Sequence, residues 1–211
     1  MRRMNAPAAA SRLAAPTKGE ETRALILEAA VLQASTSGFA SLTIGSLAEK
    51  TGMSKSGLFA HFGSKEELQI AALDEASRRF TEQVFLPAMK APRGLKRVRA
   101  IFDNWTTWPE RAKLPGGCPV DQATREFQHQ PGAMRDAVLE RQRVLDRELS
   151  KSVQMAIDAG ELAADTDPRQ FAMEMIGIML VFYRVQLLIG STEAAERAHV
   201  AFDRLIKNHT R

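Results

Sequence analysis

Residues 43–65 read TIGSLAEKTGMSKSGLFAHFGSK. Bulky apolar residues recur in it at helical spacing, and glycine, serine, alanine and cationic residues fill the positions between them. No acidic residue follows Glu49 until Glu66. The pattern predicts short helices with one buried side and one small outer side that carries no negative charge.

Gly52-Met53-Ser54 divides this stretch into two helices. We expect Thr43 to cap the first and Ser54 to cap the second, which ends at Gly63. Gly52 suits the turn because glycine adopts the left-handed conformation without strain. Two short helices joined in this way match the helix-turn-helix pattern. The expected core of the pair is Leu47, Ala48, Met53, Leu58 and Phe62.

The second helix then presents Lys55, Ser56, Ala60 and His61 on its outer side. No bulky or acidic group among them would hold this side away from a base-pair edge. In helix-turn-helix docking the second helix enters the major groove, where each base pair shows a distinct pattern of donors and acceptors. The segment therefore predicts binding to double-stranded DNA.

Residues 41–68, SLTIGSLAEKTGMSKSGLFAHFGSKEEL, resemble the DNA-binding signature of the TetR family of bacterial transcription regulators, and the upstream ILEAA and Gly38-Phe39 match it too. The close match covers about residues 22–73. The resemblance implies that Thr43 and Lys65 contact phosphates. It also implies that the second helix reads bases or nearby phosphates, and the predicted DNA-binding set is Thr43, Ser54, Lys55, Ser56, Ala60, His61 and Lys65.

Three departures from the family pattern affect this assignment. Phe59 stands where the family usually has tyrosine, so a hydroxyl contact to phosphate is missing. Gly45 and Gly57 replace base-reading side chains of some relatives, so part of the readout would come from DNA shape. Gln33 and Ala34 replace a large apolar pair, which is expected to thin the core.

The remaining chain predicts an all-α protein of about nine helices. The 211 residues are 26% charged and 45% hydrophobic, which is typical of a soluble globular protein, and a net charge of +4 is too mild to name a partner. The expected helices are 18–37, 43–52, 54–63, 64–85, 95–107, 121–128, 131–159, 168–189 and one from 192 onward. The expected domains are a disordered basic tail at 1–17, a helix-turn-helix domain at 18–64, and an effector-binding and dimerisation domain at 65–211 with a linker helix at 65–85.

The basic tail has an alternative interpretation. It contains Arg2, Arg3 and Arg12, with no acidic residue before Glu20. Such a segment also fits an arm that contacts DNA. It lacks the continuous apolar stretch of a signal peptide, and a single cysteine fits a reducing compartment, so the expected location is the cytoplasm.

By the resemblance, the larger domain binds a small effector of unknown identity. Aromatic and methionine residues on converging helices are the predicted lining, although the same residues also fit plain core packing. The predicted effector-binding residues are Phe102, Trp105, Trp108, Phe127, Met175, Met179 and Tyr183. Arg125, Glu126 and His129 would serve as polar anchors or form a solvated face.

The resemblance also implies a homodimer. The helix at 171–189 is apolar on most of its circumference and needs neighbours on every side, one of which a partner chain would supply. The predicted interface residues are Phe182, Val185, Leu188, Ala198, Phe202 and Leu205. The longest uncharged apolar stretch, residues 175–183, is far shorter than the roughly 20 residues that span a bilayer, so no membrane is expected.

Other chemistry finds little support in the sequence. The four histidines are scattered without ligand spacing, so no metal is expected, and no motif for a nucleotide cofactor, a nucleophile or paired catalytic carboxylates is present. Cys118 is expected to be an inert loop cysteine, with a redox-sensing thiol as the alternative.

These patterns predict a non-enzymatic, ligand-responsive transcriptional regulator, a repressor that binds a palindromic operator as a homodimer. The first alternative is a helical small-molecule carrier or enzyme with a vestigial DNA-binding motif. The second is a sequence-indifferent architectural DNA-binding protein, for which a more basic chain is expected.

Overall fold

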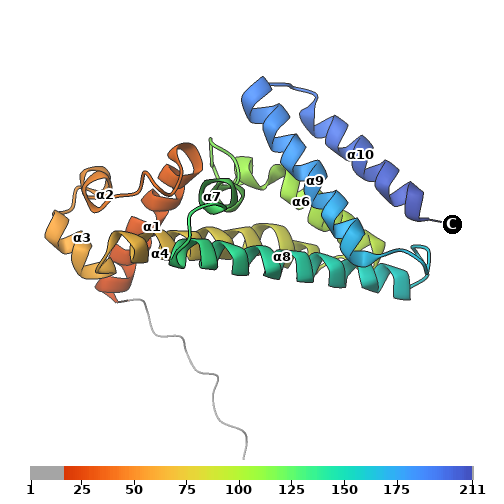
Figure 1. The fold of residues 1–211 in the computed structure, drawn as a ribbon, viewed down its shortest axis with the longest axis horizontal. Coiled ribbons are helices and arrows are strands. Elements are labelled where there is room, and N and C mark those ends of the chain that lie inside the picture. Colours follow the sequence, from red (N-terminus) through yellow and green to blue (C-terminus); the bar gives the residue numbers. More distant parts are fainter. Residues whose placement is uncertain (1–16, 211) are drawn as a thin grey trace, which may run out of the picture.

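The computed structural model describes residues 17–210, and every regular element in them is a helix (Figure 1). The elements are α1 (Lys18–Ser37), α2 (Ile44–Thr51), α3 (Lys55–Phe62), α4 (Lys65–Phe80), η1 (Thr81–Phe85), α5 (Leu86–Ala88), α6 (Leu95–Arg111), α7 (Pro119–Phe127), α8 (Ala133–Asp158), α9 (Pro168–Arg184), η2 (Val185–Ile189) and α10 (Ala194–His209). When the π-helical segments η1 and η2 and the short α5 are counted with the helices they continue, residues 17–210 form nine helices. The all-α prediction is confirmed.

The N-terminal helices begin at the capping residues that the sequence indicates. Thr17 forms a capping box with Glu20, Thr43 forms one with Ser46, and the Ser54 hydroxyl accepts a hydrogen bond from the Gly57 amide. Each cap satisfies a backbone N–H that has no partner inside its helix. Thr17 is thus the N-cap of α1, and the rest of the predicted tail falls in residues 1–16, which lie outside the described residues.

Helices α1 to α3 form a head at one end of the molecule. Leu47, Leu58 and Phe62 are buried in its core with Ala48, and Met53 is half-buried against them, as predicted. Gly52 has φ 68° and ψ 17°, the left-handed conformation that the tight turn requires. The turn and the buried side of the pair fix which residues of α3 face outward.

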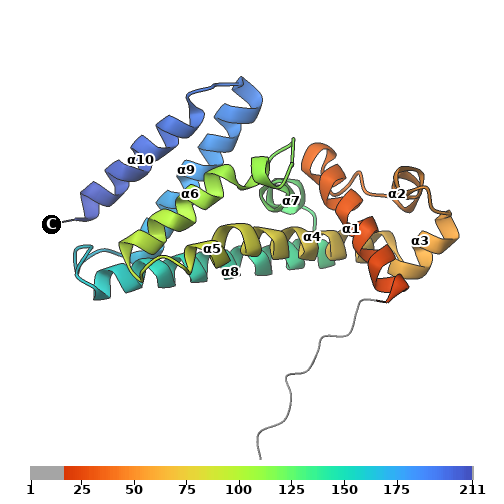
Figure 2. The same ribbon diagram turned by 180° about the vertical axis from the view of Figure 1, so that it is seen from behind.

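The body consists of the remaining helices, and its two longest helical segments lie side by side (Figures 1 and 2). The α4–η1–α5 segment runs from the head along the whole body next to α8. Helix α6 and the α9–α10 hairpin cover the far half. The core of the head continues into the body, because it also contains Ala123 and Phe127 of α7 and Met134 and Val138 of α8.

Helix α6 extends beyond its predicted end at Thr107 and includes Pro109. Proline has no N–H, so the Trp105 carbonyl loses its usual helical donor. The Tyr183 hydroxyl of α9 donates to that carbonyl at 3.4 Å. The contact between helices replaces the lost bond and allows the helix to pass the proline.

The α9–η2 segment, Pro168–Ile189, is the one helix in the described part of the chain that is long and apolar enough to cross a membrane by length and composition. The core helix of a soluble protein passes the same test, and Glu174 and Arg184 interrupt this one. Only 28% of its most apolar window is buried inside the protomer. The segment therefore carries an apolar face that its own chain leaves uncovered.

Candidate nucleic-acid interface and ligand cleft

The structure places the predicted DNA-binding side chains on the outer surface of the head. Ser54, Lys55, Ser56 and Ala60 are exposed, and His61 is half-buried next to the Phe62 ring. All lie on α3 or at its N-terminus, with Ser54 and Ser56 joined by a hydrogen bond between their hydroxyls at 3.2 Å. The exposed Phe59 ring interrupts this polar surface.

Thr43 and Lys55 come together at the start of α2. Thr43 is exposed, and its Oγ1 accepts a hydrogen bond from the Ser46 amide at 3.0 Å. A Cβ atom on Gly45 would lie 3.7 Å from Lys55 Cε and 3.8 Å from Thr43 Oγ1. Both distances are ordinary van der Waals contacts, so the Lys55 side chain lies close to Gly45 in the first turn of α2, and a cation beside a helix N-terminus favours an anion.

The turn between α1 and α2 is held by four hydrogen bonds from the body side. The Glu126 carboxylate of α7 accepts from the Phe39 amide at 2.7 Å and from the Ala40 amide at 2.6 Å. From α4, Gln69 Nε2 donates to the Phe39 carbonyl at 2.7 Å, and Lys65 Nζ donates to the Ala40 carbonyl at 2.8 Å. Two helices of the body therefore fix the N–H and C=O groups of both residues of this segment, which we call the Phe39–Ala40 turn.

These contacts change two predictions. Glu126 is not a polar anchor for an effector, because both of its carboxylate oxygens bind the Phe39–Ala40 turn. Lys65 is exposed as a phosphate contact requires, but one of its three donors is already used within the protein. Arg125 is exposed and pairs with Asp121 at 2.8 Å, and His129 is exposed after α7, so both side chains fit the alternative of a solvated face.

The surroundings of Gln33 also differ from the thinned core that the sequence predicts. Its side chain is buried, and Nε2 donates to the Ser41 carbonyl at 3.1 Å and to the Ser46 hydroxyl at 3.3 Å. Ala34 is fully buried beside it. The departure from the family pattern therefore replaces apolar packing by a polar connection between α1 and the first turn of α2.

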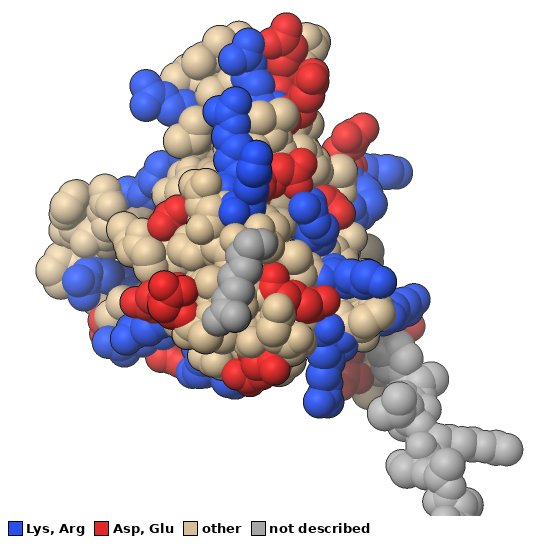
Figure 3. Space-filling view, turned by 90° about the vertical axis from the view of Figure 1, so that its right-hand side faces the viewer, with Lys and Arg blue, Asp and Glu red and all other residues tan. Residues whose placement is uncertain are grey.

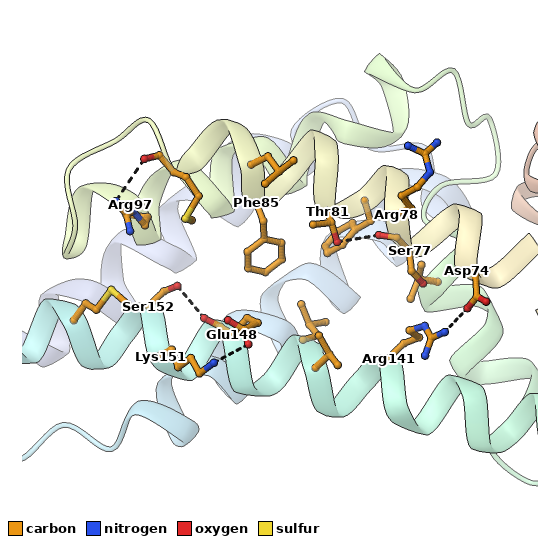
Figure 4. A pocket seen from close by; sticks show the side chains of 17 residues that line it. Asp74, Ser77, Arg78, Thr81, Phe85, Arg97, Arg141, Glu148, Lys151 and Ser152 are labelled. Atoms are coloured by element: carbon orange, nitrogen blue, oxygen red, sulfur yellow. Dashed lines mark hydrogen bonds and ion pairs between the residues drawn. The ribbon is translucent and has the colours of Figure 1, made fainter. Parts of the chain in front are cut away.

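A cavity of about 550 Å³ lies between the α4–η1–α5 segment and α8 (Figure 4). Its volume falls in the range of small-molecule sites, about 300–1,000 Å³. Phe80, Phe85, Leu145 and other apolar residues form the middle of the cleft, and charged residues stand around it. The polar and charged lining consists of Asp74, Ser77, Arg78, Thr81, Arg97, Arg141, Glu148, Lys151 and Ser152.

The predicted effector-binding residues do not line this cleft. Trp105, Met179 and Tyr183 line a smaller cavity of about 40 Å³, which shares Phe80, Val120 and Leu145 with the cleft. Phe102, Trp108 and Met175 are packed in the body core, and Phe127 belongs to the core of the head. The apolar pattern identified buried residues correctly, but burial alone does not distinguish a core from the wall of a cavity. The signal that was missed is the mixed polar and apolar character of the α4 and α8 faces that meet here.

The predicted dimer residues divide into three groups. Phe202 is buried within the protomer, where its ring stacks on Phe102 with centroids 4.0 Å apart. Phe182, Ala198 and Leu205 are nearly buried and lie, with the half-buried Val185, along a groove of about 710 Å³ between α9 and α10. Leu188 is 77% exposed beyond the end of that groove. The exposed apolar residue Val181 lines the groove and was missed.

The buried titratable groups do not form a reactive site. Burial raises the pKa of the Cys118 thiol to about 12, and burial also raises the pKa of Tyr183. A thiol with a raised pKa is mostly protonated at neutral pH, which favours the inert cysteine over the redox alternative. Among residues 17–210 no three His, Cys, Asp or Glu side chains are grouped so that they could hold a metal ion.

The far end of the molecule differs from the head in its charge distribution. Figure 3 views the end toward which the C-terminus of α10 and the end of α8 point, and acidic and basic side chains are interspersed on it. By contrast, the outer side of α3 carries Lys55 and no acidic residue. The acid-free surface is therefore a feature of the head and not of this end of the molecule.

Comparison with known proteins supports both parts of this description. Residues 26–72 match the family described as bacterial regulatory proteins, tetR family, and residues 94–202, over half of the chain, match the tetracyclin repressor-like C-terminal domain. No curated protein matches the chain at a significant level.

Several solved structures share the fold over nearly their whole length. A TetR-family transcriptional regulator from Cytophaga hutchinsonii is 21% identical with a TM-score of 0.79, covering 93% of this chain and 98% of its own. A TetR transcriptional regulator from Chloroflexus aurantiacus is 26% identical with a TM-score of 0.79, covering 90% and 94%. AibR, solved in complex with isovaleryl coenzyme A and operator DNA, is 22% identical with a TM-score of 0.70, covering 87% and 97%. With both family matches in sequence order, the chain belongs to the TetR family of transcriptional regulators.

Proposed function

We propose that this protein is a homodimeric repressor that binds a palindromic operator and is released from it by a small-molecule effector. The observation that carries the proposal is the outer side of α3, which is exposed, small and free of acidic residues. A surface with these properties fits the major groove of double-stranded DNA. The proposed site of action is the cytoplasm, where the operator is found.

In this proposal two sets of residues contact DNA in different ways. Lys55, Ser56, Ala60 and His61 face base edges or the phosphates beside them. Thr43 and the N-terminus of α2 bind a phosphate, and Lys65 binds another through the donors that the Phe39–Ala40 turn leaves free. Phosphate contacts position the head, and base contacts give sequence preference.

The proposed dimer forms through α9 and α10. Pairing these helices with those of a second protomer would cover the groove between them and the exposed apolar residues of the α9–η2 segment. A two-fold axis would then hold two α3 helices about 34 Å apart, one turn of DNA, which matches a palindromic site.

The effector is proposed to act through the α4–α8 cleft. Helix α4 lines this cleft and, through Gln69 and Lys65, also holds the Phe39–Ala40 turn. A ligand that separates α4 from α8 would therefore move the head and change the spacing of the two α3 helices. The free energy of DNA binding can change only by the amount by which the ligand binds the second conformation more tightly than the first, typically about 1–3 kcal/mol. AibR, a structural neighbour, was solved with both a small molecule and operator DNA.

Selection of binding sites from a random double-stranded DNA library tests this function. The purified protein is expected to enrich a palindrome whose half-sites are centred one helical turn apart. Enrichment of a single half-site, or of no sequence at all, would contradict the proposal of a homodimeric operator-binding protein.

A further inference from the structure

Most of the cationic residues that line the α4–α8 cleft are paired with a carboxylate, and one is not. Arg141 pairs with Asp74 at one end of the cleft, and Arg78 is hydrogen-bonded to Glu75 at 2.7 Å. On the α8 side Lys151 pairs with Glu148 at 2.9 Å. Each of these cations has a carboxylate partner and therefore little unsatisfied charge to offer a ligand.

Arg97, on the first turn of α6, is the exception among the cationic lining residues. It forms no ion pair with any described carboxylate, and it lies at the end of the cleft away from the Arg141–Asp74 pair (Figure 4). Its Nη2 donates to the Ala91 carbonyl at 3.0 Å and makes a long contact of 3.5 Å to the Met89 carbonyl.

The remaining donors of Arg97 have no partner within the described chain. Nε is buried without a hydrogen bond, and Nη1 makes none to the described residues. The carbonyl contacts hold the side chain in place. Protein atoms enclose Nε but not Nη1, so Nη1 is the unpaired donor that a ligand can reach, and a charge-assisted hydrogen bond to a carboxylate is a strong one.

Glu161 lies near the same turn but does not neutralise Arg97. Its Oε2 accepts a hydrogen bond from the Leu95 amide at 2.6 Å, so this carboxylate caps α6, and it forms no ion pair with the arginine. Between Arg97 and the Arg141–Asp74 pair, Phe85 faces the Lys151–Glu148 pair and Ser152 of α8 (Figure 4), and Phe80 and Leu145 also line the cleft. The cleft thus combines apolar residues on both walls with one cation that no described carboxylate pairs.

From this arrangement we propose that the cleft binds an amphiphilic anion, with its apolar part along Phe85 and Leu145 and its carboxylate on Arg97. This inference rests on the proposed function, because it assigns the chemical class of the effector. The carboxylate would accept a hydrogen bond from Arg97 Nη1, and the hydrocarbon would lie against the apolar residues of the cleft. A neutral molecule of the same shape would gain only the apolar contact.

Calorimetric titration with matched pairs of ligands tests the proposal on the full-length protein. The pairs are a straight-chain acid and its alcohol (decanoate and decanol), a branched acid and its alcohol, and an aromatic acid and its alcohol. In at least one pair the acid is expected to bind about ten- to a hundredfold more tightly, the strength of a hydrogen-bonded charge. If no acid binds more tightly than its neutral partner, the proposal is overturned.

Two variants locate the effect. Arg97→Gln is expected to remove the preference for the acid while the alcohol binds as before, which also shows that the cleft is still folded. Lys96→Gln, which removes an exposed cation one residue away, is the matched control and should keep the preference. An acid preference that survives Arg97→Gln, or that disappears equally in Lys96→Gln, would overturn the assignment to Arg97.

The same ligands separate this inference from the proposed function. If the acid binds through Arg97 but leaves DNA binding unchanged, the ligand class stands and the proposed release of DNA fails. If neutral amphiphiles release the DNA as well as acids do, the regulation stands and the ligand class fails.

Discussion

Lys55 and Lys65 are both exposed lysines of the head, but their surroundings differ. Lys55 lies on α3 beside Gly45 and makes no hydrogen bond to a described residue, so its ammonium group is available to a base or a nearby phosphate. Lys65 stands at the start of α4 and already donates to the Ala40 carbonyl. In the proposed function, Lys55 reads the sequence and Lys65 positions the head.

We predict that Lys55→Ala changes which operator sequence is preferred. Loss of a base contact should reduce the free-energy difference between the preferred base pair and the other base pairs by about 1–3 kcal/mol at one position of each half-site. Competition between operator variants measures this change. Lys90→Ala, an exposed lysine beyond the far end of α4, is the control and should bind like the parent. An unchanged preference in Lys55→Ala would show that this residue does not read bases.

Cys118 should be unreactive in the folded protein. Burial raises the pKa of its thiol to about 12, so almost no thiolate exists at about pH 8, where an ordinary cysteine is partly ionised. Iodoacetamide labelling followed by mass spectrometry is expected to modify Cys118 only after denaturant is added. Rapid labelling of the native protein would instead support a redox role.

At the scale of elements, helix boundaries were predictable because capping residues act locally. Thr17, Thr43 and Ser54 each fix the start of their helix through one or two hydrogen bonds. The passage of α6 through Pro109 was not predictable, because it depends on Tyr183, which is 78 residues away from Trp105 in sequence. The α4–α8 cleft could not be predicted for the same reason, since it exists only where two distant helices meet.

The Phe39–Ala40 turn joins the head to the body. Its contacts could not be predicted from the sequence pattern either. Glu126 of α7 lies 87 residues from Phe39, and no local signal distinguishes it from an exposed glutamate. Gly38 fits this arrangement because its Cβ would lie 2.9 Å from a Glu126 oxygen, and its φ of 77° favours glycine.

We predict that Glu126→Gln loosens the connection between head and body. An amide can accept from only one side, so a charge-assisted hydrogen bond is lost, and the free energy of unfolding should fall by about 1–3 kcal/mol. Urea denaturation measures this change. Glu140→Gln removes an exposed carboxylate of α8 and should leave stability within about 0.5 kcal/mol of the parent. Equal stability of the two variants would show that the Glu126 contact contributes nothing.

At the scale of the whole molecule, the fold class and the number of helices followed from periodicity and caps, but the assembly did not. Phe202 was assigned to the interface because α10 is amphipathic, yet α10 directs that ring toward Phe102. A one-dimensional pattern shows that a side is apolar, and it cannot show whether the same chain or a second one covers it. Val181, 60% exposed on α9, is one of the apolar side chains that the protomer leaves uncovered.

We predict that Val181→Glu prevents dimer formation, because two unpaired carboxylates would be buried near the two-fold axis. Sedimentation velocity is expected to show a monomer for this variant. Leu139→Glu, which places the same charge on α8 at a residue that is 37% exposed, is the control and should remain dimeric. A dimer that survives Val181→Glu would place the interface elsewhere.

The central claim is that two α3 helices, one from each protomer, enter successive major grooves of a palindromic site. Fluorescence anisotropy with DNA from the protein's own promoter region, over a series of salt concentrations, tests it most directly. We expect a dissociation constant of about 10⁻⁸ M or lower for this DNA, and the affinity should fall steeply as the salt concentration rises. Binding to a scrambled site should be at least about a thousandfold weaker. Equal affinity for the two sequences, or no binding to either, would contradict it.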